Sequence, residues 1–289
     1  KIVTYNNFLT EDLAREIVNK HGQIDLICAN NVFAHIDDMS DVTKAIKLLI
    51  KPSGIFVFEV HYIGSLIDEV QYDMIYHEHI YYYSLLTLQK FFSRFALEIF
   101  DIKSVPIHGG SMRYYVRHSN NSEEHINSSN LIQLQKKEYE KGYDKKTTFL
   151  NYAEAVNITK TNLISLLKKL KKKNKLVVGY GASGRANTLI QYCGINEEFI
   201  NYIVDDAPMK QGFYTPGSHI EIFSRDKLEE FTPDFILIFA WSFFNEIIEK
   251  NIKYLKQGVK FIIPLPKVKI IYLESGSIVE EIYENQKGD

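Results

Sequence analysis

Short apolar runs and helical patterns alternate along residues 1–120. Residues 24–29 and 55–60 are apolar runs of the length expected for buried parallel strands, and turn-forming residues 51–54 precede the second run. Between the two runs, apolar residues recur at helical spacing at Val42, Ile46, Leu49 and Ile50, with Asp38, Ser40 or Asp41 as candidate N-caps. A strand, a helix and a strand within about 35 residues predict a βαβ unit.

The residues that follow predict one more helix and two more strands. Residues 87–95 have a helical pattern, and residues 97–103 and 113–117 are strand-like. Gly109 and Gly110 lie between these two strands and supply a turn signal. Residues 1–120 are therefore predicted to form one α/β domain.

A polar segment rich in Lys and Glu follows, over residues 121–174. Its apolar positions recur at helical spacing, so we interpret it as a helical connector between two domains. It ends in a basic run at Lys168, Lys169, Lys171, Lys172, Lys173 and Lys175. Cations are favoured at a helix C-terminus, which makes a solvated cap the leading interpretation and a phosphate-binding role the alternative.

Residues 175–289 repeat the alternation of strands and helices. The predicted strands cover residues 176–180, 200–204, 235–240 and 259–263, with helical segments such as 244–255 between them. This order is typical of a doubly wound domain with a parallel sheet. The predicted fold class is α/β, with two such domains.

Composition narrows the possible partners. The chain has 289 residues, 45% of them hydrophobic, and a net charge of -2, so it has no overall cationic field for nucleic acid or an anionic membrane. Cys28 and Cys193 are the only two cysteines, too few for a four-thiolate zinc site, and they fit a reducing cytoplasm. No apolar stretch reaches the roughly 18 to 20 residues of a membrane helix. We expect small-molecule partners.

The start of the chain lacks both a signal-peptide layout and an initiator methionine. Its first residues, from Lys1 to Tyr5, have the pattern of a strand inside a sheet. We therefore expect the true N-terminus to lie upstream.

The second domain carries a glycine loop directly after its first predicted strand. Residues 179–184 read Gly-Tyr-Gly-Ala-Ser-Gly and open a helix, and Asp205 ends the next strand. Glycines in this context let a phosphate approach backbone N–H groups, so the loop is predicted to hold a nucleotide diphosphate, with Arg185 adding charge. NAD binding and a purely structural turn are the alternatives, and no Tyr-x-x-x-Lys pair supports hydride transfer.

The highest density of chemically capable side chains is the run Tyr76-His77-Glu78-His79. In an extended segment His77 and His79 would point one way, and Tyr76 and Glu78 the other. A histidine held by a carboxylate is the ordinary way to build a general base near neutral pH. A metal site is one alternative, although the run lacks the His-Glu-x-x-His spacing, and a structural hydrogen-bond network is another.

His35 follows the carboxyl end of the strand at residues 24–29, where open α/β sheets bind ligands. The Tyr76–His79 run follows the next strand of the same predicted sheet. We expect His35 and the run to overhang one crevice, although His35 alone is as well explained as an ordinary loop histidine.

Five blocks of the sequence resemble, in order, the S-adenosylmethionine-dependent sugar C-methyltransferases, whose type members are nucleotide-sugar C-3-methyltransferases of deoxysugar pathways. These blocks are residues 29–35 (Ala-Asn-Asn-Val-Phe-Ala-His), 54–60 (Gly-Ile-Phe-Val-Phe-Glu-Val), 75–79 (Ile-Tyr-His-Glu-His), 108–111 (His-Gly-Gly-Ser) and 179–182 (Gly-Tyr-Gly-Ala). The resemblance runs over nearly the whole chain. It implies a partial class I methyltransferase (Rossmann-like) domain over residues 1–120, followed after the connector by a C-terminal Rossmann-like domain over 175–289 that helps to hold a nucleotide sugar.

The resemblance also implies roles for individual residues. His79 would be the general base, Glu78 and Tyr76 its supporting and substrate-contacting neighbours, and His35 a further active-site residue. The implied cofactor is S-adenosylmethionine, with Asn7 and Phe8 near its adenine and Asn30, Asn31 and Phe33 near its methionine part. The implied substrate contacts are His77, His108, Gly109, Gly110, Ser111, Gly181, Ala182, Ser183, Gly184 and Arg185.

Two parts of the family pattern have no counterpart in this chain. They are the cysteine-rich zinc domain, so that zinc is expected only in that absent domain, and the glycine-rich loop that forms the main cradle of the cofactor. The leading hypothesis is base-catalysed C-methylation of a nucleotide-linked keto-sugar by a monomer or dimer. The alternatives are a non-catalytic fragment that binds a nucleotide sugar and, third, an NAD-dependent enzyme.

Overall fold

The computed structural model describes residues 2–120 and 128–285. Contacts divide the chain into two units: unit 1 comprises Lys1–Ile67 and His77–Phe149, and unit 2 comprises Asp68–Tyr76 and Leu150–Asp289. The chain therefore leaves unit 1 before residue 68 and returns to it within the Tyr76–His79 run. Residues 121–127 of the predicted connector lie outside the described residues.

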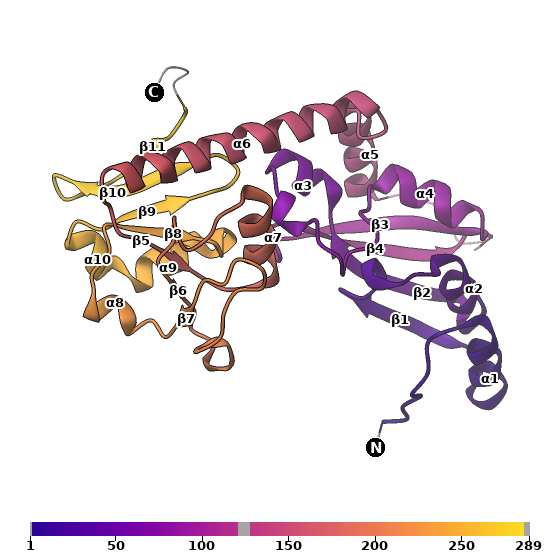
Figure 1. The fold of residues 1–289 in the computed structure, drawn as a ribbon. Helices are drawn as coiled ribbons and strands as arrows, with labels where there is room; N and C mark the ends of the chain where they lie inside the picture. The colour runs from indigo at the N-terminus through magenta and orange to yellow at the C-terminus, as the bar shows by residue number, and fades with distance from the viewer. Residues whose placement is uncertain (1, 121–127, 286–289) are drawn as a thin grey trace. The chain divides into compact units, whose positions relative to one another are not determined.

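Unit 1 is a four-stranded sheet with helices packed against it, in the order β1-β2-β4-β3 (Figure 1). The pair β1–β2 is parallel, and β4 pairs antiparallel with both β2 and β3. The strands are β1 (Ile24–Asn30), β2 (Ile50–His61), β3 (Leu97–Val105) and β4 (Ser111–His118), and the helices are α1 (Glu11–His21), α2 (Met39–Leu49), α3 (Ile63–Asp68), α4 (Leu85–Ser93) and α5 (Ser129–Lys141). The βαβ unit β1-α2-β2 and the β3–β4 hairpin confirm the predicted elements.

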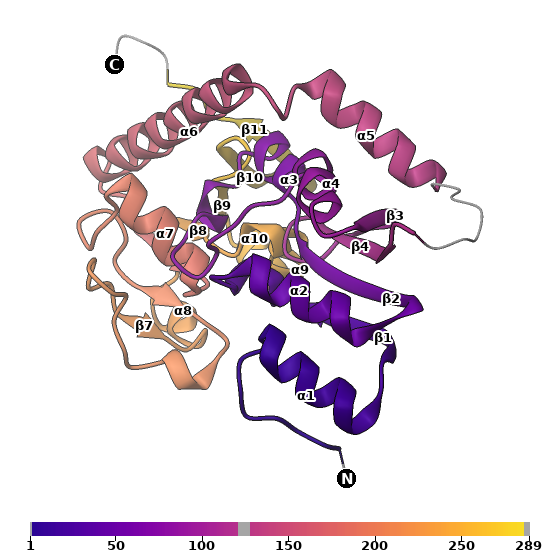
Figure 2. The same ribbon diagram turned by 90° about the vertical axis from the view of Figure 1, so that its right-hand side faces the viewer.

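Side-chain caps explain where the helices of unit 1 begin. Asp38 caps α2 by accepting a 3.0 Å hydrogen bond from the Asp41 amide, which selects one of the three candidate caps. Ser84 and Thr87 form a capping box at the start of α4. The two helices α1 and α2 run side by side next to β1 and β2 (Figure 2).

Three expectations about the first strands were wrong. Residues 2–5, expected to be a strand inside a sheet, belong to no strand, and Ile2 is 92% exposed. Strand β1 is an edge strand among the described residues, and Leu26 is 55% exposed instead of buried. The turn-forming residues 51–54 do not precede β2 but lie inside it, where the register jumps from Ile24↔Ile50 to Leu26↔Ile55. The extra residues bulge out of the pairing, so the turn propensity is satisfied locally without ending the strand.

Helix α5 is anchored to unit 1 by a buried carboxylate. Glu138 has no exposed surface. Its oxygens accept hydrogen bonds from the amides of Leu85 (2.8 Å) and Leu86 (2.9 Å) and from the Tyr62 hydroxyl (2.9 Å). Burial raises the pKa of Glu138 even though these bonds favour its charged form. The first helix of the predicted connector thus packs into unit 1.

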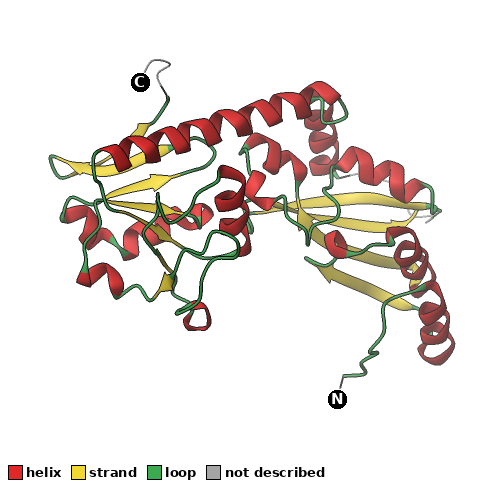
Figure 3. Cartoon of the chain, in the orientation of Figure 1, coloured by secondary structure: helices red, strands yellow, loops and turns green. Residues whose placement is uncertain are grey.

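Unit 2 is built on a seven-stranded sheet in the order β11-β10-β9-β8-β5-β6-β7. Figure 3 draws the strands in yellow and the helices in red. Its elements are α6 (Lys146–Lys172, which begins in unit 1), β5 (Val177–Tyr180), α7 (Gly184–Cys193), β6 (Ile203–Val204), β7 (Ile222–Phe223), α8 (Lys227–Glu230), β8 (Phe235–Ile238), α9 (Phe244–Lys250), α10 (Ile252–Lys256), β9 (Lys260–Ile263), β10 (Lys269–Glu274) and β11 (Ser277–Ile282). The strands from β9 to β7 are parallel, as the sequence predicts, whereas β10 and β11 form an unpredicted antiparallel hairpin. The mixed α/β, Rossmann-like fold class is confirmed.

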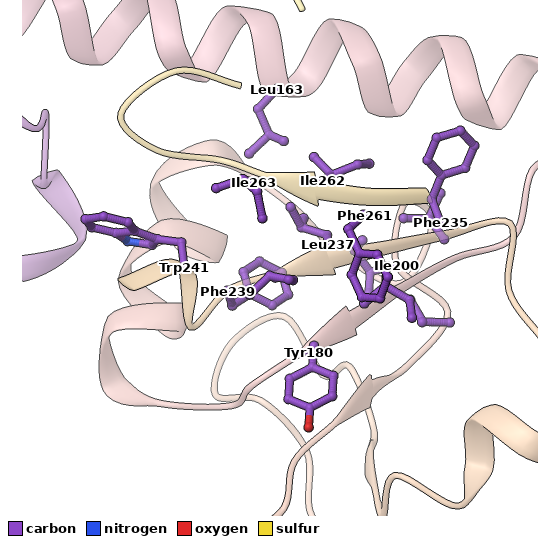
Figure 4. Close-up of a cluster of buried hydrophobic side chains, with 14 of the residues drawn as sticks. Leu163, Tyr180, Ile200, Phe235, Leu237, Phe239, Trp241, Phe261, Ile262 and Ile263 are labelled. Carbon is purple, nitrogen blue, oxygen red and sulfur yellow. The ribbon is translucent and has the colours of Figure 1, made fainter. Parts of the chain in front are cut away.

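The core of unit 2 lies between this sheet and its helices. Phe239, Phe261 and Ile262 are essentially fully buried, and Leu163 of α6 points toward Ile262 and Ile263 (Figure 4). Burying large side chains of this kind contributes about 1.5–3 kcal/mol each relative to exposure. Across residues 2–120 and 128–285, no helix combines the length and the apolar character needed to cross a bilayer.

Candidate functional site

His35 and His79 come together in unit 1. His35 ends a short 3-10 helix over Phe33–His35, just after β1, and its ring centroid lies 5.1 Å from that of His79. The sequence predicts that these two residues overhang one crevice. In the structure their rings are in contact. His79 also has the Tyr82 ring edge-on at 6.1 Å.

A short hydrogen bond fixes the tautomer of His35. Its Nδ1 lies 2.6 Å from the backbone carbonyl oxygen of Glu78. Because a carbonyl only accepts, Nδ1 must carry a proton, and Nε2 of the neutral ring is left as the basic nitrogen. The Glu78 group that contacts His35 is thus its backbone and not its carboxylate.

Backbone contacts hold the two segments around this pair. The Ile80 amide donates to the Ala34 carbonyl at 3.0 Å, and the Tyr81 hydroxyl donates to the Asp37 carbonyl at 3.1 Å. Both contacts flank the bond between His35 and Glu78. The loop after β1 and the loop that carries His79 are therefore tied together at three points.

The Tyr76–His79 run is a bend at Tyr76 followed by a turn at His77 and Glu78. Its side chains do not alternate as they would in an extended segment. His77 and Glu78 are exposed, whereas Tyr76 and His79 are partly buried. The run therefore presents two side chains to solvent and keeps the candidate base half-sheltered.

The residues His108–Ser111 form the turn of the β3–β4 hairpin, also in unit 1. Gly110 has φ of 116°, and a Cβ there would lie 2.4 Å from the Ser65 Oγ, so only glycine fits. The Gly110 carbonyl accepts from the Tyr62 amide at 3.2 Å, and the next amide, of Ile63, donates to the Tyr83 carbonyl at 3.0 Å. Residues 62–63 thus link the hairpin turn to the segment that follows His79.

The predicted cofactor contacts fall into two groups by exposure. Asn7, Phe8, Asn30 and Asn31 are exposed, Phe8 by 93%. Phe33 has no exposed surface and packs in the core, with its ring centroid 4.8 Å from that of Phe58. It supports the base of this loop and presents no side chain to solvent. The role of each residue stays a prediction.

The glycine loop of unit 2 is engaged by a carboxylate of its own chain. Asp205 Oδ2 accepts from the Ala182 amide at 2.7 Å and from Lys210 Nζ at 3.1 Å, and Oδ1 accepts from the Ala207 amide at 2.8 Å. Burial acts to raise the pKa of Asp205, but these hydrogen bonds outweigh it and lower the pKa. In dinucleotide-binding loops the corresponding acid bonds a ribose hydroxyl, so this arrangement weighs against the NAD alternative.

The remaining residues of the glycine loop differ in exposure. Ser183 and Gly184 are exposed, Ser183 caps α7, and no atom lies within 4 Å of a Cβ built on Gly184. Gly181 is buried, with φ of 93°. Arg185 does not reach toward solvent: its Nε donates to Asp73 Oδ2 at 2.8 Å, and its Nη2 lies 2.8 Å from the same oxygen.

Within the described part of the chain, no three His, Cys, Asp or Glu side chains are grouped as ligands of a metal ion. Asp73 lies three residues before the Tyr76–His79 run, and the sequence did not reveal its partners. An acidic residue between Tyr72 and Met74 is a signal of a buried carboxylate, which requires a paired cation. Its partner lies 112 residues further along the chain.

Comparison with known proteins identifies the class to which this fold and these loops belong. A family model described as the C-methyltransferase C-terminal domain matches residues 106–266, and a methyltransferase-domain model matches residues 3–101. The chain belongs to the C-methyltransferase family.

A relative within that class is C-methyltransferase NovU from Streptomyces niveus. The chain is 30% identical to it over 266 residues, which covers 92% of this chain and 63% of NovU. The chain thus spans less than two thirds of that relative. The resemblance seen in the sequence is confirmed at the level of the family, while the sugar, its carbon position and the truncation stay predictions.

Proposed function

We propose that this chain carries the base and substrate-binding parts of an S-adenosylmethionine-dependent enzyme that methylates a carbon of a nucleotide-linked keto-sugar. The contact between His35 and His79, at the carboxyl end of β1 in a methyltransferase-type sheet, is the observation that carries the proposal. Open α/β sheets bind their ligands at that end of the strands.

In the proposed reaction, His79 removes the proton from the carbon next to the sugar ketone. The electrons of that C–H bond move toward the ketone oxygen and give an enolate. Tyr76, three residues before the base, donates a hydrogen bond to this developing oxyanion, which is where a preorganised donor contributes most. His35 supports His79 through ring contact and through its bond to the Glu78 carbonyl.

S-adenosylmethionine, as the second substrate, supplies an electrophilic methyl carbon: the new C–C bond forms as the C–S bond breaks and its electron pair returns to sulfur. The exposed side chains of Asn30 and Asn31 fit a role in holding its polar methionine part, because Asn30 ends β1 and Asn31 follows it. The Phe8 ring, 93% exposed, fits contact with a flat adenine. The proton taken by His79 passes to solvent after methyl transfer.

In this proposal the nucleotide-sugar diphosphate lies at the exposed end of the glycine loop. Ser183 and Gly184 are accessible there at the N-terminus of α7, where amide groups and the helix dipole favour an anion. The Ala182 amide is not available, because it bonds Asp205. Gly184 leaves room for close approach, since a Cβ at that position would meet no atom within 4 Å.

The test uses the full-length protein, methyl-labelled S-adenosylmethionine and a panel of keto-sugar nucleotides. We expect label transfer by the wild-type protein and a loss of about 10²–10⁴-fold in kcat for His79→Ala, the range for removing a general base. His219→Asn is the matched control, because His219 is exposed and lies in a loop of unit 2. Full transfer by His79→Ala would reject the assigned base.

Calorimetry separates this proposal from the non-catalytic alternative. The proposal requires the protein to bind both the nucleotide sugar and S-adenosylmethionine. Binding of the nucleotide sugar without measurable binding of S-adenosylmethionine would favour a non-catalytic binding protein. Saturable NADH binding would instead support the NAD alternative.

A further inference from the structure

Asp73, Arg185 and Trp241 form a buried polar cluster inside unit 2. Asp73 is 1% exposed, and its Oδ2 accepts from Arg185 Nε at 2.8 Å and from Trp241 Nε1 at 2.9 Å. The Arg185 guanidinium also lies 5.2 Å from the centre of the Trp241 ring, close enough for a cation–π contact. Two side chains from distant parts of the chain thus converge on one carboxylate oxygen.

The cluster fixes one end of the segment that leads into the proposed base. Asp73 lies in a 3-10 helix over Tyr72–Met74, and Tyr76 follows three residues later. Tyr72 is anchored too: its hydroxyl lies 3.3 Å from Cys193 Sγ, and its ring centroid lies 5.1 Å from that of Tyr192. Residues 72 and 73 are therefore held by the last and the second residue of α7, respectively.

Arg185 connects the buried cluster to the glycine loop. Arg185 directly follows Gly184 of the glycine loop, so a single side chain joins that loop to the segment before Tyr76. Replacing a buried ion pair by apolar residues often leaves stability unchanged or higher. A charged pair in this place is therefore better explained by a need for one defined geometry than by a need for stability.

We propose that Arg185 is a positioning residue, which acts through Asp73 to hold the segment before Tyr76 in the geometry that the base requires. Arg185 touches neither substrate in this account, in contrast to the phosphate contact predicted from the sequence. The fork of the guanidinium places two nitrogens against one carboxylate oxygen, an arrangement that the single ammonium of lysine reproduces only in part. The inference rests on the proposed function of His79.

The experiment compares Arg185→Met, Arg185→Lys and the control Arg117→Met in the full-length protein. Arg117 pairs with Glu98 at 2.7 Å in unit 1, so the control also removes an arginine–carboxylate pair. Two quantities are measured: the kinetic constants for methyl transfer and the deuterium uptake of backbone amides in residues 68–82.

For Arg185→Met we expect kcat to fall about 100-fold, the effect of displacing a catalytic group by about 1 Å, with KM for S-adenosylmethionine unchanged within about twofold. Amide exchange in residues 68–82 should rise about 10-fold, without a matching rise across the rest of unit 2. Arg185→Lys should recover part of both losses. Arg117→Met should change neither quantity.

The inference would be overturned if Arg185→Met had the same kcat and the same amide exchange as the wild-type protein. A uniform rise of amide exchange throughout unit 2 would also overturn it, because it would indicate that the contact only stabilises the unit. If Arg185→Met does not fold, Arg185→Lys decides by the same two readouts. If the wild-type protein transfers no methyl group, the proposed function fails, while the exchange of residues 68–82 still decides whether Arg185 positions this segment.

Discussion

The Tyr76–His79 run and the glycine loop are both rich in groups that could bind or react, yet their environments differ. In the run, His77 and Glu78 are exposed, and the contacts that tie the surrounding loops together use backbone groups of Ala34, Asp37 and Glu78. In the glycine loop, polar groups are already committed: the Ala182 amide to Asp205 and the Arg185 side chain to Asp73.

The difference shows that a polar group in a motif can bind a ligand only if it is not already bonded to another group of the chain. Around the run, backbone groups hold the neighbouring loops together, and the side chains of His77 and Glu78 are exposed. The Asp205 carboxylate accepts the hydrogen bond of the Ala182 amide, which a phosphate would otherwise accept. We therefore assign the proposed chemistry to the His35–His79 pair of unit 1 and the proposed ligand contact of the glycine loop to its outer end, at Ser183 and Gly184.

A large effect is expected from disturbing the contacts that hold the loops around the Tyr76–His79 run. His35→Phe keeps a ring beside His79 but removes the nitrogen that donates to the Glu78 carbonyl. We expect kcat/KM for methyl transfer to fall about 100-fold, because the base is then misplaced. Steady-state kinetics would measure it.

Tyr81→Phe is the matched comparison, since it removes a hydrogen bond between the same two loops, to the Asp37 carbonyl. Its effect should be much smaller, because no residue with a proposed catalytic role takes part in that bond. Equal losses in the two variants would mean that any contact between the loops matters and that His35 has no special role.

Removing the Asp205 carboxylate, which bonds the glycine loop, should lower the stability of the protein. Asp205→Ala leaves the Ala182 and Ala207 amides without their acceptor, and we expect the free energy of unfolding to fall by about 1–3 kcal/mol. Urea unfolding would measure this. Asp206→Ala is the control: Asp206 is about half exposed, and its contacts are one hydrogen bond from Tyr180 and a long ion pair with Lys250. A loss as large in Asp206→Ala would argue against the specific role of Asp205.

The same carboxylate predicts a dependence on pH. Burial raises the pKa of Asp205, but the Ala182 and Ala207 amides and Lys210 outweigh burial, so the folded-state pKa lies below the ordinary value near 4. Its stabilising contribution is complete above the unfolded-state pKa and is lost as pH falls through the folded-state pKa. The stability difference between wild type and Asp205→Asn should therefore shrink as pH falls from about 6 to about 3. A constant difference would contradict the assignment.

The smallest effect is expected at the outer end of the glycine loop. Gly184→Ala meets no atom within 4 Å and lies at the start of α7, so stability should stay the same or rise by up to about 1 kcal/mol. If a diphosphate approaches this backbone, binding of the nucleotide sugar should weaken at the same time, as calorimetry would show. Unchanged binding would indicate that the outer end of the loop is structural as well.

Much of the fold could be predicted because its signals are local. The βαβ pattern, the Asp38 cap and the glycine turn in the β3–β4 hairpin all depend on residues close together in the sequence. The β10–β11 hairpin was missed although Ser275 and Gly276, both with positive φ, mark its turn. The contact between His35 and His79 could be anticipated because each follows a neighbouring parallel strand.

The partners of the glycine loop could not be predicted in the same way. Nothing near Arg185 in the sequence indicates that it forms an ion pair with Asp73, 112 residues earlier. The spacing of Asp205 matches a ribose-binding acid, and only the folded geometry shows both of its oxygens bonded within the chain. Long-range polar pairing of this kind leaves no periodic trace in a single sequence.

The central claim is that His79 removes a proton from the carbon next to the sugar ketone, and hydrogen exchange at that carbon tests it most directly. The full-length protein is incubated with a nucleotide-linked keto-sugar in D₂O without a methyl donor, and deuterium incorporation is followed by NMR. We predict incorporation by the wild-type protein and by His219→Asn, and a rate at least about 100-fold lower for His79→Ala. Incorporation by His79→Ala at the wild-type rate would contradict the claim.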